Sequence, residues 1–133
     1  MSDKLNYIEA IKWFKKAVNN KNPVAMFYLG REYYTGEHIA QDFKQAFSLL
    51  LSAAQKNVVD AQIDIGLMYV LGQGMEKPDP VTGYAWIGMA YDQGANYAKK
   101  ILKDIEQDFG LKNTQKMAAK KLMAALLRKI NNK

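Results

Sequence analysis

Few residues of this chain have the types and spacing that chemistry requires. His38 is the only histidine, it stands next to Glu37 in a polar stretch, and the chain contains no cysteine. A protein metal site needs several nitrogen, sulfur or carboxylate ligands, so an isolated histidine predicts no metal site. We interpret His38 as a solvated loop residue, and we expect the protein to use neither a metal nor another cofactor.

Asp60 and Asp64 lie four residues apart and could share a cation or act as a carboxylate pair. More often such a pair is one charge near a helix start and one exposed acid. The run Gly72–Gly74 has no strand before it, so it indicates a turn rather than a phosphate-binding loop. No nucleophile, base and orienting group occur together, and we predict no catalytic residue and no enzyme activity.

The elements that must position these residues are repeated along the chain. Residues 25–36 read AMFYLGREYYTG and residues 61–72 read AQIDIGLMYVLG, an offset of thirty-six. The identical pairs are Ala25 and Ala61, Gly30 and Gly66, Tyr33 and Tyr69, and Gly36 and Gly72. A fixed offset of this length is typical of proteins built from stacked structural repeats.

Helix geometry explains why these residue types recur. Ala25, Leu29 and Tyr33 are spaced by four and share one stripe of a helix. Gly30 lies beside that stripe, and a glycine inside a helix costs about 1 kcal/mol relative to alanine. Its recurrence predicts that a neighbouring helix approaches the backbone closely there. Gly36 follows the last apolar residue, where a left-handed residue commonly ends a helix.

The repeated unit is a pair of helices, since residues 10–18 match residues 46–54 at the same offset. We expect Asp42 to cap the second helix of the unit. In the next copy, aligning Ala46 with Ala85 needs an offset of thirty-nine, which places three extra residues in a loop. The prediction is one all-α domain over residues 1–133. It comprises a half repeat at 6–19, repeats at 24–56 and 60–93, and a third unit with a C-terminal cap at 95–133. In this cap we expect Asn113 or Thr114 to cap a long helix that ends near Ile130. Its inward side would carry Met117, Ala118, Leu122, Ala125, Leu126 and Ile130.

The pattern A-x-x-x-L-G-x-x-Y-x-x-G from Ala25 to Gly36, followed by Gln41–Asp42, Ala53–Ala54 and Ala61–Gln62, resembles the Sel1-like repeat, a relative of the tetratricopeptide repeat. The resemblance covers roughly residues 7 to 107. It implies an α-solenoid, a right-handed superhelix of antiparallel helix pairs. It further implies an adaptor or scaffold without chemistry of its own, from a bacterium.

The net charge of +6 comes from the C-terminal part of the chain. Residues 1–98 carry nine basic and ten acidic side chains, whereas residues 99–133 carry ten and three. A basic face on the last helix, made by Lys116, Lys120, Lys121 and Arg128, could meet nucleic acid, an anionic lipid surface or an acidic protein. We favour a solvated capping helix, because few aromatic residues interleave with the lysines. No apolar run is long enough for a signal or a membrane span, so we expect a cytoplasmic protein.

The residues that we expect to bind a partner lie beside the packing stripe. Phe27, Arg31 and Tyr34 form a second stripe of the first helix, and Ile63 and Leu67 occupy matching positions in the next unit. Aromatic residues and arginine are enriched in binding hot spots, which favours a protein or peptide partner in a concave groove. The alternative is that apolar residues such as Ile63 and Leu67 pack against the adjacent unit. A third possibility is self-assembly through the uncovered N-terminal helix.

Overall fold

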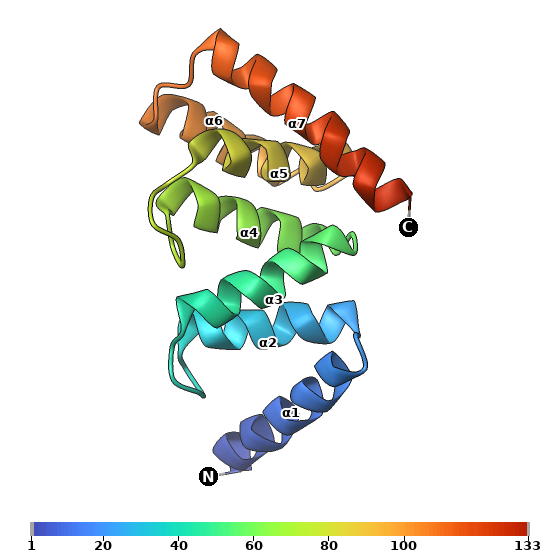
Figure 1. Ribbon diagram of the computed structural model, residues 1–133. Coiled ribbons are helices and arrows are strands. Elements are labelled where there is room, and N and C mark those ends of the chain that lie inside the picture. The colour runs from blue at the N-terminus through green and yellow to red at the C-terminus, as the bar shows by residue number, and fades with distance from the viewer. Residues whose placement is uncertain (1, 133) are drawn as a thin grey trace.

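The chain folds into a stack of helices that follow one another in sequence order. The structure is a computed structural model that describes residues 2–132. Its helices are α1 (Ser2–Asn19), α2 (Pro23–Thr35), α3 (Phe43–Gln55), α4 (Val59–Leu71), α5 (Pro80–Asp92), α6 (Ala98–Asp108) and α7 (Asn113–Asn131). The stack runs from α1 at one end to α7 at the other (Figure 1). The described residues contain no strand, so the predicted all-α architecture is confirmed there; residues 1 and 133 lie outside them.

Local sequence signals set the helix ends. Asp42 caps α3 as predicted, because its carboxylate accepts hydrogen bonds from the backbone N–H groups of Lys44 and Gln45, both at 3.1 Å. These hydrogen bonds, first of all the one from Gln45, lower the pKa of the Asp42 carboxyl. Gly36 and Gly72 end α2 and α4 in the left-handed conformation, with φ of 69° and 74°. Among the described residues, no helix is both long enough and apolar enough to cross a membrane.

The glycines inside α2 and α4 lie where the next helix crosses. A methyl group on Gly30 would stand 2.8 Å from Leu50 Cγ, and one on Gly66 would stand 2.5 Å from Ile87 Cγ1. Both distances are shorter than carbon–carbon contacts allow, so the close approach predicted from the repeat is confirmed. The core lies along these crossings, and its largest fully buried apolar side chains are Leu50, Ile65, Met68, Ile87 and Met89.

The predicted alignment of the second copy is wrong by two residues. Leu50 meets Gly30 as Ile87 meets Gly66, and α3 and α5 begin and end thirty-seven residues apart rather than thirty-nine. Ala46 therefore corresponds to Gly83 and not to Ala85. The physical reason is that the contact with the preceding glycine fixes the register. The loop between α4 and α5 thus has one extra residue instead of three.

A left-handed residue also closes each turn between units. Lys21 and Asn57 have φ of 62° and 65°, and Gly94 takes the same place after α5 with φ of 106°. In each turn a backbone N–H then donates to an alanine carbonyl; the pairs are Asn22 to Ala17, Val58 to Ala53 and Ala95 to Ala90, at 3.0–3.1 Å. The turns therefore repeat in geometry even where their residues differ.

Replacing Lys21 by glycine should stabilise the protein. A left-handed non-glycine residue costs roughly 1–2 kcal/mol, while glycine adds about 0.4–1 kcal/mol of unfolded-state entropy, so we expect a net gain of about 0.5–1 kcal/mol. Chemical denaturation measures this change. Asn57→Gly is the contrasting variant, because Asn57 Oδ1 accepts a 2.9 Å hydrogen bond from Gln62 Nε2 and its loss should cancel the gain. Equal effects of the two substitutions would contradict this account.

The last helix packs on a different stripe from the one its sequence suggests. The residues predicted to face inward were Met117, Ala118, Leu122, Ala125, Leu126 and Ile130. Leu126 and Ile130 do pack against the core, together with Met123 and Leu127, but Met117 is 60% exposed. Met123 lies over Gly88 of α5, where a methyl group would stand 2.9 Å from the Met123 Sδ. The helix begins at Asn113 and is capped by Gln115, whose side chain accepts from Lys112 N, so the predicted cap at Asn113 or Thr114 is wrong.

Candidate functional site

A small pocket opens between α2 and α4, at the level of the repeated glycines. Its lining residues are Arg31, Tyr34, Thr35, Leu50, Asp64 and Leu67, and its volume is about 170 Å³. Leu50 and Leu67 give the pocket an apolar part, and the other four provide charges and hydroxyl groups. The pocket therefore combines apolar surface with polar groups on two successive units, as binding sites commonly do.

An ion pair joins the two helices at this pocket. Arg31 Nε lies 3.4 Å from Asp64 Oδ2, and the side chains are 58% and 26% exposed. Burial raises the pKa of Asp64 to about 6, Arg31 acts in the opposite direction, and the negative charge of Asp60 raises the pKa further. The single arginine thus compensates only part of the cost of burying this carboxylate. Asp64 would gain from any additional donor that a bound molecule supplied.

A second polar contact continues this surface toward α6. The hydroxyl of Tyr97 donates a 2.7 Å hydrogen bond to Asp60 Oδ1. Asp60 and Asp64 lie one turn apart on α4, so α4 is linked to α2 on one side and to the start of α6 on the other. No group of three or more potential metal ligands occurs among residues 2–132. The two aspartates act here as hydrogen-bond and ion-pair partners between units.

The arrangement of helix pairs agrees with a known sequence family. The model of the Sel1 repeat matches residues 2–22, 23–58 and 59–94. The chain belongs to the Sel1 repeat family. The first match includes one helix, α1, and the other two each include a complete helix pair.

Solved structures of Sel1 repeat proteins show the same fold. A protective antigen present in uropathogenic Escherichia coli strains and displaying an SLR fold superposes with a TM-score of 0.83 at 26% sequence identity. A Sel1 repeat protein from Oxalobacter formigenes gives a TM-score of 0.67 at 27% identity. The matches cover 90% and 77% of this chain but 25% and 42% of those chains. No curated protein matches the chain. The predicted all-α repeat solenoid is confirmed by these structures.

The Sel1 repeat fold brings three of the five predicted groove residues together. Arg31, Tyr34 and Leu67 line the α2–α4 pocket. Tyr34 also donates a 2.8 Å hydrogen bond to Gln73 Oε1, which ties the loop after α4 to α2. Whether these residues bind a partner stays a prediction. Asp64 also lines this pocket, although the sequence indicates an exposed acid outside the groove. The repeat relates Asp64 to Tyr28 and not to Arg31, so the sequence carried no signal for this ion pair.

Phe27 and Ile63 do not lie on an open face. For Phe27 the expectation is wrong, and for Ile63 the alternative of burial by packing holds. They are only 6% and 3% exposed. Phe27 lies under Arg31, whose guanidinium carbon is 5.3 Å from the ring centroid, and Ile63 belongs to a buried cluster with Ile87 and Ala90. Both side chains stabilise the surface from beneath and cannot contact a partner directly.

His38 is not a solvated loop residue as predicted. Its Nδ1 lies 2.7 Å from Glu32 Oε2, and both side chains are 20% exposed. The imidazole also stacks on the ring of Tyr7, with centroids 3.6 Å apart. His38 therefore attaches α1 to the loop that follows α2. The contact joins residues thirty-one positions apart, and no periodicity in the sequence indicates it.

The predicted basic face on α7 is interrupted. Lys116 forms an ion pair with Glu106 of α6, and this hydrogen bond raises the pKa of Lys116. Lys120 and Lys121 are exposed, while Arg128 lines a pocket with Gln55 of α3 and Trp86 of α5. The four residues thus lie in different surroundings, and they do not form one uniform basic patch.

Proposed function

We propose that this Sel1 repeat chain is a protein-interaction module that binds a partner polypeptide across α2 and α4. Sel1 repeat proteins are generally scaffolds for protein–protein interaction, and the family is typically non-catalytic. The observation that supports this particular surface is the Arg31–Asp64 pair, which bridges two units beside an open pocket. The module acts by equilibrium binding and uses no cofactor.

The pocket suits one anchoring side chain of a partner. Its volume of about 170 Å³ is that of a single large side chain, and its walls offer Leu67 for apolar contact and Arg31 and Tyr34 for polar contact. Tyrosine and arginine are enriched among the few interface residues that carry most of the binding energy. We infer that affinity is concentrated at this pocket and that the surrounding surface sets specificity.

Removing the polar wall of the pocket should abolish partner capture. The test variant is Arg31→Ala with Tyr34→Ala, and the matched control is Arg128→Ala with Tyr28→Ala, which removes the same residue types from exposed positions elsewhere. Loss of one or two hot spots of 2 kcal/mol or more lowers affinity by roughly thirtyfold or beyond. A quantitative pull-down followed by mass spectrometry should show a protein retained by the wild type and the control and lost from the test variant. Equal retention by all three would argue against this surface.

The other functions suggested by the sequence stay predictions. Binding of nucleic acid or an anionic surface by α7 has less support now that Lys116 is paired with Glu106. Self-assembly through α1 predicts a molecular mass that rises with protein concentration. The bacterial origins of the two similar structures support a bacterial source for this chain, and action in the cytoplasm remains an expectation.

A further inference from the structure

The C-terminal half of α7 covers the groove between α3 and α5. Its apolar residues Met123, Leu126, Leu127 and Ile130 pack against the core cluster that contains Ala53 and Ala54 of α3 and Trp86 of α5. Contacts of α7 with both α5 and α3 agree with this position. Here the chain's own amphipathic helix α7 covers the groove between α3 and α5, which are the second helices of two successive units.

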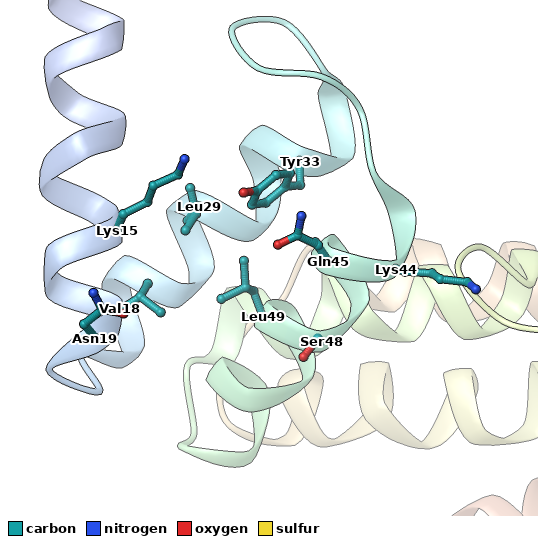
Figure 2. A pocket seen from close by; sticks show the side chains of 9 residues that line it. All are labelled: Lys15, Val18, Asn19, Leu29, Tyr33, Lys44, Gln45, Ser48 and Leu49. Carbon is teal, nitrogen blue, oxygen red and sulfur yellow. The ribbon is translucent and has the colours of Figure 1, made fainter.

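The equivalent groove one unit earlier, between α1 and α3, is open. Gln55 and Trp86, which line the pocket beside the end of α7, correspond in the repeat to Asn19 and Leu49. Asn19 and Leu49 both line a pocket of about 460 Å³ between α1, α2 and α3. Figure 2 shows Leu49 of α3 facing this space across from Val18 of α1, with Leu29 and Tyr33 of α2 above them in this view. The open α1–α3 groove thus lies at the same place in the repeat as the α3–α5 groove that α7 covers, and its floor is apolar.

The charge around this groove is positive. Lys15 reaches from α1 over the groove toward Leu29 (Figure 2), and it makes no ion pair within the part of the chain that the structure describes. Lys44 belongs to the α3 wall, with its ammonium group directed away from α1. Lys16 and Glu9 line the neighbouring pocket of α1, where the Lys16 ammonium lies 5.4 Å from the Trp13 ring centroid. Among the described residues, no acidic side chain lines the α1–α3 groove itself. Acidic groups on an occupant would therefore be favoured.

The charge also argues against a second copy of α7 as the occupant. The α7 sequence contains five basic residues and no acidic one. Placing it in the α1–α3 groove would bring these cations close to Lys15, and like charges in contact lower affinity.

We propose that the α1–α3 groove binds an amphipathic helix of a partner protein that carries acidic residues along its edges. The helix lays apolar side chains on the partly buried Val18 and Leu49, as α7 does on Trp86, and its carboxylates pair with Lys15. Amphipathic helices that dock in apolar grooves are a common mode of recognition. This surface is separate from the α2–α4 pocket, so either one can fail without the other.

Two synthetic peptides test the proposal with the full chain. One has the α7 sequence, and the other has the same sequence with its five lysine and arginine residues replaced by glutamate. We expect the acidic peptide to bind with a dissociation constant on the order of 10–100 µM at low salt and the α7 peptide at least tenfold more weakly. Backbone amide NMR signals of Lys15, Leu29 and Leu49 should shift on binding. The indole signal of Trp86 should stay unchanged, because it would shift only if the peptide displaced the chain's own α7.

Charge reversal at one position separates specific from general attraction. Lys15→Glu should weaken binding of the acidic peptide at least tenfold, whereas Lys103→Glu, an equal charge change at an exposed site on α6, should change it less than twofold. Circular dichroism melts check that both variants fold. The proposal is overturned if the acidic peptide does not bind at 1 mM, if the α7 peptide binds as tightly, if only Trp86 responds, or if both variants weaken binding equally.

Discussion

Gly83→Ala is expected to lower the free energy of unfolding by about 2–3 kcal/mol, although alanine is the better helix former by about 1 kcal/mol. A methyl group on Gly83 would stand 2.4 Å from the backbone oxygen of Gly66 and 2.5 Å from Val70 Cγ2. The backbone of α4 cannot yield as a side chain can, because its position is fixed by packing along the whole helix. The two helices would have to separate at the crossing.

Gly88→Ala is the matched control on the same helix. A methyl group there would approach Met123 Sδ at 2.9 Å, and this flexible side chain can move aside. We expect its stability to stay within about 1 kcal/mol of the wild type. Urea denaturation of the three proteins, supported by melting temperatures, measures the difference. If Gly83→Ala proved as stable as Gly88→Ala, close backbone contact would not be the reason for the glycine.

Asp64→Asn is expected to stabilise the protein at neutral pH. Burial raises the folded-state pKa of Asp64 to about 6 from an ordinary value of 3.8, so the folded state binds the proton more tightly than the unfolded state does. Protonated Asp64 therefore makes its full favourable contribution to the free energy of unfolding below about pH 4. This contribution is lost as the pH rises toward 6. The shift corresponds to at most about 3 kcal/mol. Since the Arg31 pair is also weakened, we expect Asp64→Asn to gain on the order of 1–2 kcal/mol at pH 7.5.

The difference between wild type and Asp64→Asn isolates this group from the other carboxylates. Unfolding free energies measured from pH 4 to pH 8 should show a gain that is largest above pH 6 and disappears near pH 4. A gain that is independent of pH would mean that shape rather than charge explains it. A variant that is more stable but binds the partner less well would support a role of Asp64 in recognition, because binding sites often retain groups that reduce stability.

Much of the scaffold could be predicted because the repeat encodes it locally. The glycine at each helix crossing, the glycine at each helix end and the Asp42 cap all follow from geometry within one unit. The offset of the second copy could not be predicted in this way. It depends on which residue of α5 meets Gly66. Because Gly83 and Ala85 are both small, Ala46 could be aligned with either of them.

The binding surface was harder to predict because α4 is apolar on most sides. Its sequence, VDAQIDIGLMYVL, leaves few polar positions to indicate which side meets water. Ile63 and Leu67 therefore seemed equivalent, although the first is buried and the second lines a pocket. Phe27 was misplaced for a related reason, since Arg31 covers its ring and a helical stripe does not show what lies above it.

Polar contacts between distant residues could not be read from the sequence at all. Gln62 is completely buried, its Nε2 donates to Asn57 Oδ1 at 2.9 Å, and its Oε1 accepts from Gln93 Nε2 at 2.9 Å. This chain of amides joins the turn after α3 to the end of α5, and each bond depends on the register of the other helix. Ala61–Gln62 was part of the family pattern, but its role in fixing one unit on the next appears only in three dimensions.

The one-sided packing of α1 should let this helix open before α4 and α5. Every helix from α2 to α5 has substantial neighbours on two sides, whereas α1 packs chiefly on α2 and is further held by the Tyr7–His38 stack. Amide hydrogens of α1 should therefore exchange with solvent much sooner than those of α4 and α5, through local opening rather than global unfolding. Since α1 is also one wall of the open groove, a helix bound there would slow this exchange. Slower hydrogen exchange of the α1 amides would then show that the α1–α3 groove is occupied.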